Sequence, residues 1–593
     1  MAKAVPIIAA IASIFAPQLS PVLNVAASTI TSAALAATIA SQVYEANQAR
    51  KAAKNAQDAA QQDRLVTFRS TDAPREIAYG TVYKGGVIAY DESHGADKRF
   101  ISIVVLLAHG QSDAIEEVFL DNVPLGTLDA SGYVQPGSQF YKAKIVPEVV
   151  TKTIGELTIG TTFVLPHTPA GGVLRSVAGI TQSGAYKLFA SGTDYSLSGN
   201  VVTILSDAFT NPAPDINPGA NAIVSDVTFT YDWDDGRGLV QCRKFLGNTS
   251  TAAWPTGCRD TELEGYTSDL GESAWASTDL WLGVTRIRLT VEFDSDIFGQ
   301  TGLGNITVRL RGNKVYNWVS AGTAWSNNAL RCCVDYLTTY CGFTAGDIDS
   351  VMAAVAQNVC DESVPTKSGG SQARYTCDVV LSTDADPIEN LKILLGAMCG
   401  SAVPAGPMWR IRAGAYEAPV FTLTDTDLAP AAMNVRPAMT QDELFNSVQG
   451  LFNDPSQFGQ STNWPPYVSA TYVAEDGGAP IFADFDLPAT NDPERAQRIA
   501  KLQLRRARQA LRWTATYNLS AWPIQAGDTI RLKHSLLGWD SIDAGAGKEF
   551  RVLERKATPD MQFQLVCQEE SAWAYEWSAS EAVQADPTPN TAF

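Results

Sequence analysis

The sequence predicts a multidomain protein of the α+β class that is mostly β, and three observations lead to this prediction. The chain has 593 residues, of which 45% are hydrophobic and 18% are charged, a length and balance typical of several folded domains. From about residue 65 onward, short alternating runs separated by Gly, Asn and Asp are typical of strands and turns. Only a few segments repeat apolar residues at helical spacing, and the two clearest begin with Asp-Pro, at 386–387 and 492–493.

The N-terminal segment, residues 1–64, differs from the rest of the chain. Residues 4–44 contain no charged side chain, and residues 45–62 are polar and rich in Ala. We therefore expect an apolar helical N-terminal segment. Three interpretations stay open: small-residue helices that pack against partners or further copies, a contact with a membrane, and a cleaved signal peptide with Lys3 as its only basic residue.

The next part of the chain is predicted to be one β-rich domain interrupted by a second β unit. Residues 150–226 are rich in Thr, Gly and Ser with short alternating runs, and we expect them to form an inserted β module. The strands on either side, 65–149 and 227–320, are expected to belong together. Val227 to Cys242 is predicted to be a hairpin with its turn around Trp233–Gly238.

Helices are expected in the second half of the chain. Residues 321–415 have helical spacing followed by a strand and are predicted to be an α+β domain. Residues 416–578 are predicted to be a second β-rich domain that contains one long helix, 492–512. Residues 579–593, rich in Pro and Thr at their end, are expected to be a flexible C-terminal tail.

The helix at 492–512 carries the one candidate site. Its apolar residues form an arc on one side, and basic residues form a stripe on the other. The stripe can meet carboxylates of a neighbouring domain or subunit, lie in solvent, or face DNA inside a channel. We take it as a candidate interface or lumen stripe that consists of Arg498, Lys501, Arg505, Arg508 and Arg512.

No catalytic, cofactor-binding or metal-binding residues are predicted. The four His are far apart, and the sequence contains no HExxH, no GxSxG and no CxxC. The nine cysteines are dispersed in mostly apolar segments and are expected to be reduced, buried thiols. The alternative is a metal or iron–sulfur centre at Cys332, Cys333, Cys341 and Cys360. The net charge of −19 disfavours a dedicated nucleic-acid binder, because such affinity comes from Lys and Arg that neutralise phosphates.

Several segments, taken in order, resemble one family: the tail-tip (baseplate) hub proteins of long-tailed bacteriophages, related to the tip attachment, host-specificity proteins of lambdoid phages. The most specific is Asp442-Glu-Leu-Phe-Asn-Ser-Val-Gln-Gly-Leu-Phe452. The other segments that carry the resemblance are 75–86, 117–122, 281–289, 298–299, 308–316, 327–330, 335–337, 358–362, 386–391, 408–412, 475–478, 496–500 and 527–530.

The resemblance implies a non-enzymatic structural protein of the virion, made in the host cytoplasm and without a cofactor. Such hubs are homotrimeric rings of β-barrel-like and α+β domains that close the distal end of the tail tube. They contact the distal tail protein, the tape measure protein, other tail-tip subunits and tail fibres, and they take part in host attachment and genome ejection. The insertion at 150–226 is then expected to decorate the outside of the ring.

The sequence departs from the lambdoid pattern at both ends. The chain ends soon after Trp577, where the lambdoid proteins continue into a fibre, so receptor binding is expected to belong to separate fibre proteins. The uncharged N-terminus is expected to form a plug in or near the tube lumen, to contact the tape measure protein, or to touch the host membrane transiently. Two other functions stay open: a tail-associated cell-wall or polysaccharide hydrolase, and a membrane-anchored bacterial surface adhesin.

Overall fold

A computed structural model describes most of the chain from residue 67 onward. The expected N-terminal segment 1–64 and residues 584–593 lie outside the described residues, as do Asp442 and Glu443 of the family-like run. The described residues are 67–70, 73–95, 98–143, 145–181, 185–206, 209, 223, 226–234, 236–269, 275–298, 303–437 and 444–583.

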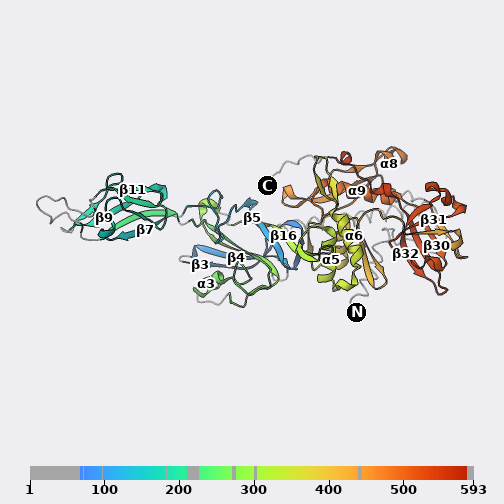
Figure 1. The fold of residues 1–593 in the computed structure, drawn as a ribbon, viewed down its shortest axis with the longest axis horizontal. Coiled ribbons are helices and arrows are strands. Elements are labelled where there is room, and N and C mark those ends of the chain that lie inside the picture. The colour runs from blue at the N-terminus through green and yellow to red at the C-terminus, as the bar shows by residue number, and fades with distance from the viewer. Residues whose placement is uncertain are drawn as a thin grey trace, which may run out of the picture.

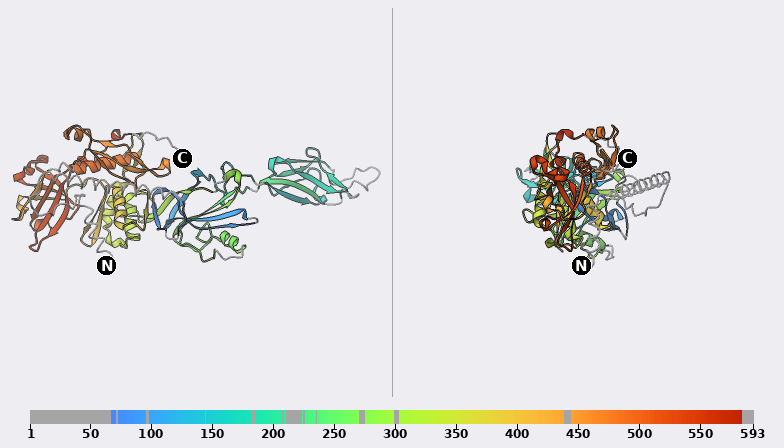
Figure 2. Two further views of the ribbon diagram at one scale, coloured as in Figure 1. Left: turned by 180° about the vertical axis from the view of Figure 1, so that it is seen from behind. Right: turned by 90° about the vertical axis from the view of Figure 1, so that its right-hand side faces the viewer.

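The described chain is mostly β with a few helices, as predicted, and it is elongated. In Figure 1 a small β module lies at one end, and a pair of sheets with β3 and β4 follows it. The helices α5 and α6 lie in the middle, and a second large sheet with β30 to β32 lies at the other end. The view from behind shows the same extended arrangement, and in the view along the long axis the parts lie one behind another (Figure 2).

Two sheets pack face to face to form the first β-rich region. Alternating apolar residues of both sheets enclose one core, which includes Val105, Ile115, Ile287 and Leu310. The first sheet has the order β14 (Val240–Leu246), β15 (Val284–Glu292), β4 (Phe100–His109) and β3 (Val87–His94). The second has the order β17 (Gly322–Trp325), β16 (Ile306–Asn317), β5 (Ser112–Leu120) and β6 (Val123–Pro124). Strand β2 (Thr81–Lys84) also pairs with β16, on the edge of β16 opposite to β5.

The inserted module has its own core and is longer than predicted. Its first strand, β7 (Ile145–Lys152), pairs antiparallel with its last, β13 (Val227–Asp234), so that Ile145 lies opposite Asp234. The strands between them are β8 (Thr162–Val164), β9 (Ser176–Ile180), β10 (Tyr186–Leu188), β11 (Tyr195–Ser198) and β12 (Val201–Ile204). The hairpin predicted for Val227 to Cys242 is therefore wrong, because β13 pairs with β7 and β9 while β14 pairs with β15.

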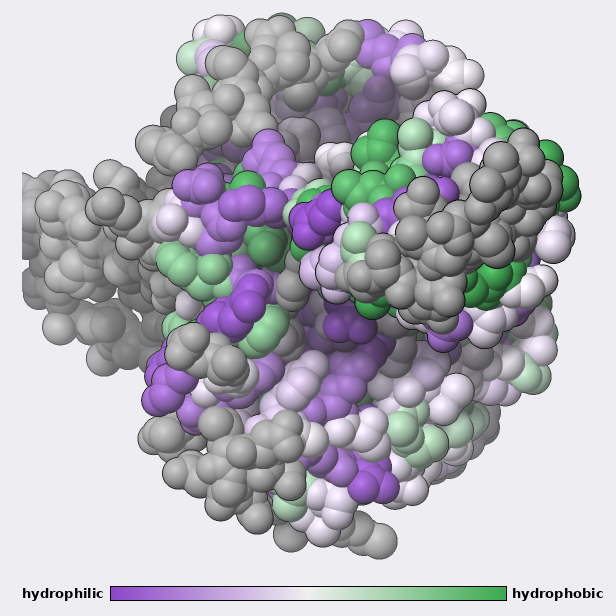
Figure 3. All heavy atoms as spheres, turned by 90° about the vertical axis from the view of Figure 1, so that its left-hand side faces the viewer, coloured by the Kyte–Doolittle hydropathy of each residue, from purple (hydrophilic) through white to green (hydrophobic). Residues whose placement is uncertain are grey.

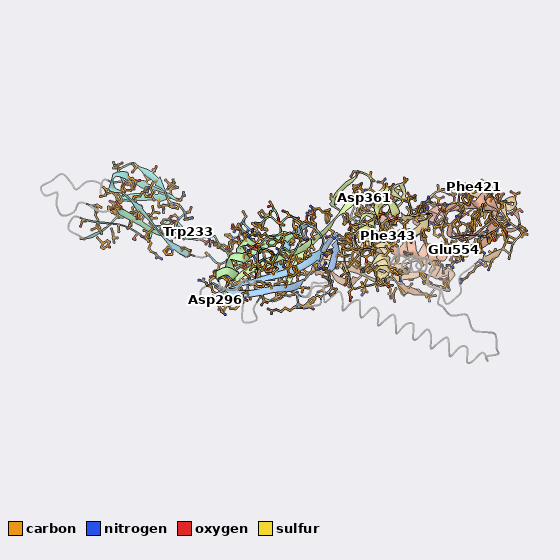
Figure 4. All side chains as sticks on the ribbon, turned by 90° about the horizontal axis from the view of Figure 1, so that it is seen from below. Trp233, Asp296, Phe343, Asp361, Phe421 and Glu554 are labelled. Atoms are coloured by element: carbon orange, nitrogen blue, oxygen red, sulfur yellow. The ribbon has the colours of Figure 1, made fainter. Side chains whose placement is uncertain are left out.

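The predicted hairpin does not form because the apolar face of β13 packs into the core of the inserted module. Val227, Phe229 and Tyr231 alternate along β13 and are fully buried in the core of the module. The polar run after Trp233 has the composition of a tight turn, but it connects two domains. Figure 4 shows Trp233 at the end of the module that adjoins the first β-rich region, where its ring stacks on His167 at 3.5 Å.

A helical core follows, and its helices begin at side-chain caps. Asn328 caps α5 (Ala329–Thr339) and Asp349 caps α6 (Ser350–Asp361). Asp386 caps α7 (Pro387–Gly396) with Pro387 in the first turn, as predicted. Around these helices lie the pairs β1 (Glu76–Tyr79) with β20 (Val379–Ser382), β18 (Ser363–Pro365) with β19 (Ser371–Ala373), and β21 (Ser401–Ala405) with β22 (Met408–Arg412).

The C-terminal half adds one long helix and one six-stranded sheet. Helix α9 (Pro493–Arg508) begins behind the Asp492 cap and packs into the helical core. The sheet has the order β23 (Phe421–Thr424), β31 (Thr529–Lys533), β32 (Lys548–Ala557), β33 (Phe563–Glu569), β30 (Arg512–Tyr517) and β24 (Asn434–Arg436). The chain between β24 and α9 contains β25 (Ser447–Gln449), β28 (Tyr467–Val468), β29 (Phe482–Asp484) and helix α8 (Ala470–Glu475), together with the pair β26 (Leu451–Asp454) and β27 (Gln460–Asn463).

The end of the described chain folds back onto α9. Residues 571–583, which we call the C-terminal strap, contain the one-turn 3₁₀ helix Ala572–Tyr575. Gln497 of α9 donates to the carbonyl of Val583 at 2.7 Å and accepts from its amide at 2.8 Å, and Ala582 is buried. The flexible tail predicted from residue 579 is therefore wrong over 579–583. This segment is held because it supplies hydrogen-bond partners to buried polar side chains of α9, the amide of Gln497 and the ammonium of Lys501.

Candidate interface on helix α9

Helix α9 is amphipathic, and both of its faces are covered. Its apolar arc, which includes Ala496, Ile499 and Leu504, is buried in the helical core. The C-terminal strap lies over part of the opposite, basic face. The predicted stripe is therefore largely an internal surface of the described chain, and its five residues have different surroundings.

Arg498 and Lys501, the first two residues of the stripe, are buried. The Arg498 side chain is 3% exposed and donates through Nη2 to the carbonyl of Arg374 at 2.7 Å. Lys501 forms an ion pair with Glu581 of the strap. Burial lowers the pKa of Lys501, and the hydrogen bond to Glu581 opposes this effect.

Arg505 and Arg508 contact the strap and helix α8. Arg505 donates to the carbonyls of Trp573 and Glu576. Arg508 makes a two-point contact with Asp476, at 2.9 and 3.0 Å, just after α8. The hydrogen bond from Arg508 lowers the pKa of Asp476.

Arg512 does not lie on the helix. Helix α9 ends at Arg508, because Gln509 leaves the helical conformation and Gln568 of β33 donates to the carbonyls of Arg506 and Gln509. Arg512 begins strand β30, opposite Gln568. The predicted helix is thus four residues too long, since a side chain from a strand far along the sequence satisfies its last carbonyls.

The strap supplies aromatic rings that sequence reasoning missed. The Lys501 ammonium lies 5.5 Å from the ring centre of Trp577, and the Arg505 guanidinium 5.0 Å from that of Trp573. The Arg506 guanidinium lies 5.2 Å from the ring of Tyr575. The spacing of aromatic residues at 573, 575 and 577 is the signal that could have indicated a cation-binding segment. An interface of the stripe with another subunit or with a lumen stays a prediction.

A cavity of about 260 Å³ lies where the first β-rich region meets the helical core. It is lined by Tyr83 of β2, Arg309 of β16, Asp378, Asn453 and Asn491, among others. Asp378 accepts from the amide of Thr81 at 2.8 Å, and burial raises its pKa. Arg309 donates to Glu116 at 2.6 Å. Both charged groups have partners within the fold.

The cysteines considered for a metal centre lie in the helical core. Cys332, Cys333 and Cys360 are 0% exposed, and burial raises the pKa of Cys360 to about 12. Within the described part of the chain, no group of three or more His, Cys, Asp or Glu is placed to hold a metal ion. None of the helices in the described ranges is long and apolar enough to span a bilayer.

Comparison with known proteins gives one family match and several structural likenesses. A family model described as "Putative phage tail protein" matches residues 386–554. A chain from the structure of the virion of a native gene transfer agent (GTA) particle has a TM-score of 0.47 and 13% identity, with 87% of this chain and 88% of that chain covered. No curated protein sequence matches the chain.

Two prophage tail proteins of known structure are more distant. The 43 kDa tail protein of prophage MuSo2 from Shewanella oneidensis has a TM-score of 0.25 and 11% identity, covering 49% of this chain and 77% of that chain. The prophage tail protein gp18 from Listeria monocytogenes EGD-e has a TM-score of 0.23 and 10% identity, covering 68% and 96%. The matched segment 386–554, from the cap of α7 into β32, is thus similar to the family of phage tail proteins.

Proposed function

We propose that this protein is a structural subunit of the bacteriophage tail tip, a baseplate hub that closes the distal end of the tail tube. The observation that carries the proposal is the family match over residues 386–554. This segment includes α7 and α9 of the helical core and most of the six-stranded sheet. It also contains the family-like runs at 386–391, 408–412, 442–452, 475–478, 496–500 and 527–530.

The proposal extends to assembly. The subunit forms a homotrimer around the tail axis, and it contacts the distal tail protein, the tape measure protein, other tail-tip subunits and the fibres. It takes part in host attachment and genome ejection as a component of the virion tail tip, without an enzymatic reaction. The N-terminal segment 1–64 serves as a plug of the lumen, a tape-measure contact or a transient membrane contact.

The inserted module fits the outside of such a ring. It lies at one end of the elongated chain (Figure 1), and hydrophobic residues gather on the lobe nearest the viewer when the molecule is seen from that end (Figure 3). Tyr186 and Leu188 of the edge strand β10 are 79% and 71% exposed. An exposed apolar edge of this kind is a surface for other tail-tip components.

Immunogold labelling of purified particles tests the proposal. Antibodies raised against the module Ile145–Asp234 are expected to bind at the distal end of the tail in negative-stain images. Light scattering of the purified full chain is expected to show about three subunits per particle. Label along the tail shaft or on the head, or particles that lack this protein in mass spectra, would overturn the proposal.

A further inference from the structure

A small cavity lies between helix α9 and the C-terminal strap. Its volume is about 10 Å³, room for one water molecule or one small ion. Arg498 and Lys501 of α9 line one side, and Trp577 of the strap lines another, with Arg374 and Tyr375 beside them. The cavity is thus formed only when the strap lies on the helix.

Two residues that line this cavity, Arg498 and Trp577, carry buried hydrogen-bond donors without a partner among the described residues. The Nε and Nη1 atoms of Arg498 and the indole Nε1 of Trp577 are buried and have no hydrogen-bond partner among the described residues. Arg498 is 3% exposed, and only its Nη2 donates, to the carbonyl of Arg374. Native proteins pair nearly all buried donors, so three unpaired donors around one cavity indicate a missing acceptor.

The carboxylates near the cavity do not pair with Arg498. Glu362 pairs with Arg374 at 2.8 Å and Glu581 pairs with Lys501. Glu576, the carboxylate that itself lines the cavity, is exposed. Arg498 has no ion pair within the described part of the chain. Burial, together with the charge of Arg495, lowers the pKa of Arg498 to about 10. A buried cation without a counter-ion is costly, and an anion would offset that cost.

We propose that Arg498 and Trp577 bind a small monovalent anion of the size of chloride in this cavity. The unpaired atoms are all donors, and an anion accepts from every one of them, whereas a water molecule also needs acceptors for its own hydrogens. The volume excludes phosphate and larger oxyanions. The bound anion joins α9 to the strap, so the identity of the salt governs how firmly residues 571–583 are held.

The first test is a crystal of the full chain soaked in sodium bromide. An anomalous peak is expected between the guanidinium of Arg498 and the indole nitrogen of Trp577. A cavity that holds an ordered water molecule and no bromide overturns the proposal. Bromide that binds there only at soaking concentration, without the stability effect described next, overturns it as well.

The second test is thermal unfolding in sodium chloride and in sodium gluconate at equal ionic strength. Chloride is expected to raise Tm, whereas gluconate is too large to enter the cavity. The variant Trp577→Phe keeps a ring over Lys501 but removes the indole donor, and we expect it to weaken chloride binding about tenfold. Equal chloride dependence in the wild type and in Trp577→Phe contradicts the proposal.

Two matched variants complete the design. Trp573→Phe removes the indole donor of the neighbouring ring, which is 42% exposed and does not line the cavity, and its chloride dependence is expected to equal that of the wild type. Glu576→Gln tests whether the exposed Glu576 carboxylate fills the cavity in place of an ion. Loss of the chloride effect in Trp573→Phe, or a chloride effect that appears only in Glu576→Gln, contradicts the assignment.

Discussion

Buried charges at single positions hold the first β-rich region to the helix that covers it. Arg288 of β15 is 0% exposed, and its Nε donates to Asp260 at 2.7 Å. Its Nη2 donates to Glu262 of helix α3 (Thr261–Asp269), to which Arg243 also donates. Burial raises the pKa of Glu262, but the hydrogen bond from Arg243 and the charges of Arg288 and Arg243 lower it overall.

Removing Arg288 is expected to be strongly destabilising. Arg288→Met leaves Asp260, which is 4% exposed, as an uncompensated buried charge, while Glu262 keeps Arg243 as its partner. The free energy of unfolding should therefore fall by about 3–5 kcal/mol. Urea unfolding followed by tryptophan fluorescence measures this loss. The control is Arg259→Met, which removes a half-exposed partner of Glu264 and should cost less than about 1 kcal/mol. Similar losses in both variants would contradict the buried-network explanation.

Asp425 makes stability depend on pH at the acidic end. The hydroxyl and amide of Ser535, with a hydrogen bond from His534, lower the pKa of Asp425 to about 2. A carboxyl whose pKa is depressed by folding stabilises the protein above its unfolded pKa of about 4, and this contribution is lost as pH falls toward 2. Because the side chain is 45% exposed, solvent screening limits the contribution to about 1 kcal/mol.

The variant Asp425→Asn tests this pH dependence. It should lower stability at pH 7 by about 1 kcal/mol and flatten the stability profile between pH 4 and pH 2. Denaturant unfolding at several pH values gives both quantities. Asp560→Asn changes the same charge in the exposed turn before β33 and serves as the control. A profile of equal slope in the wild type and Asp425→Asn would show that another group titrates there.

At the scale of single elements, the sequence predicts where helices begin better than what covers them. Asp-Pro at 386–387 and 492–493 caps α7 and α9 as expected, because a cap depends only on residues within one turn. The basic stripe is also a local pattern, but it shows only which side of α9 faces away from the apolar core. That residues 571–583 return to bury Arg498 and Lys501 depends on contacts far apart in sequence.

The clasp between α9 and the strap is expected to depend on Gln497. Its side chain is 0% exposed and makes both hydrogen bonds to Val583. Gln497→Leu keeps the volume but removes both bonds, so hydrogen exchange at 579–583 should become faster while β30 to β33 stay protected. The matched control on the same helix is Gln503→Leu, whose side chain has only a 3.7 Å contact with Cys399. Unchanged protection of the strap in Gln497→Leu would contradict this role.

At the scale of the whole molecule, the boundaries between the cores do not follow from the sequence. Four large apolar clusters form separate cores in the described chain, where the length indicates only that there are several domains. The predicted module boundary differs from the observed one because β7 and β13 have the same alternating pattern as the strands of the neighbouring domain. Only pairing distinguishes them, and pairing is set by the register of the two strands.

The module is expected to be separable from the rest of the chain. Ile145 and Asp234 lie opposite each other in an antiparallel pair, about 5 Å apart, so a short Gly-Ser linker can replace residues 145–234 without strain. The cores of the two parts share no residue, although the replacement also removes the hydrogen bond from Tyr141 to Asp234. The shortened chain should therefore keep its main thermal transition within a few degrees of the wild-type Tm.

Calorimetry and limited proteolysis of the shortened chain measure this outcome. The matched control deletes residues 150–226, the boundaries predicted from sequence, and leaves most of β7 and β13 unpaired with the rest of their sheet. This control should expose the apolar residues Phe229 and Tyr231 and aggregate. If both deletions keep the same Tm and solubility, β13 does not belong to the module. If both lose the main transition, the module is part of the cooperative fold and the two cores are not independent.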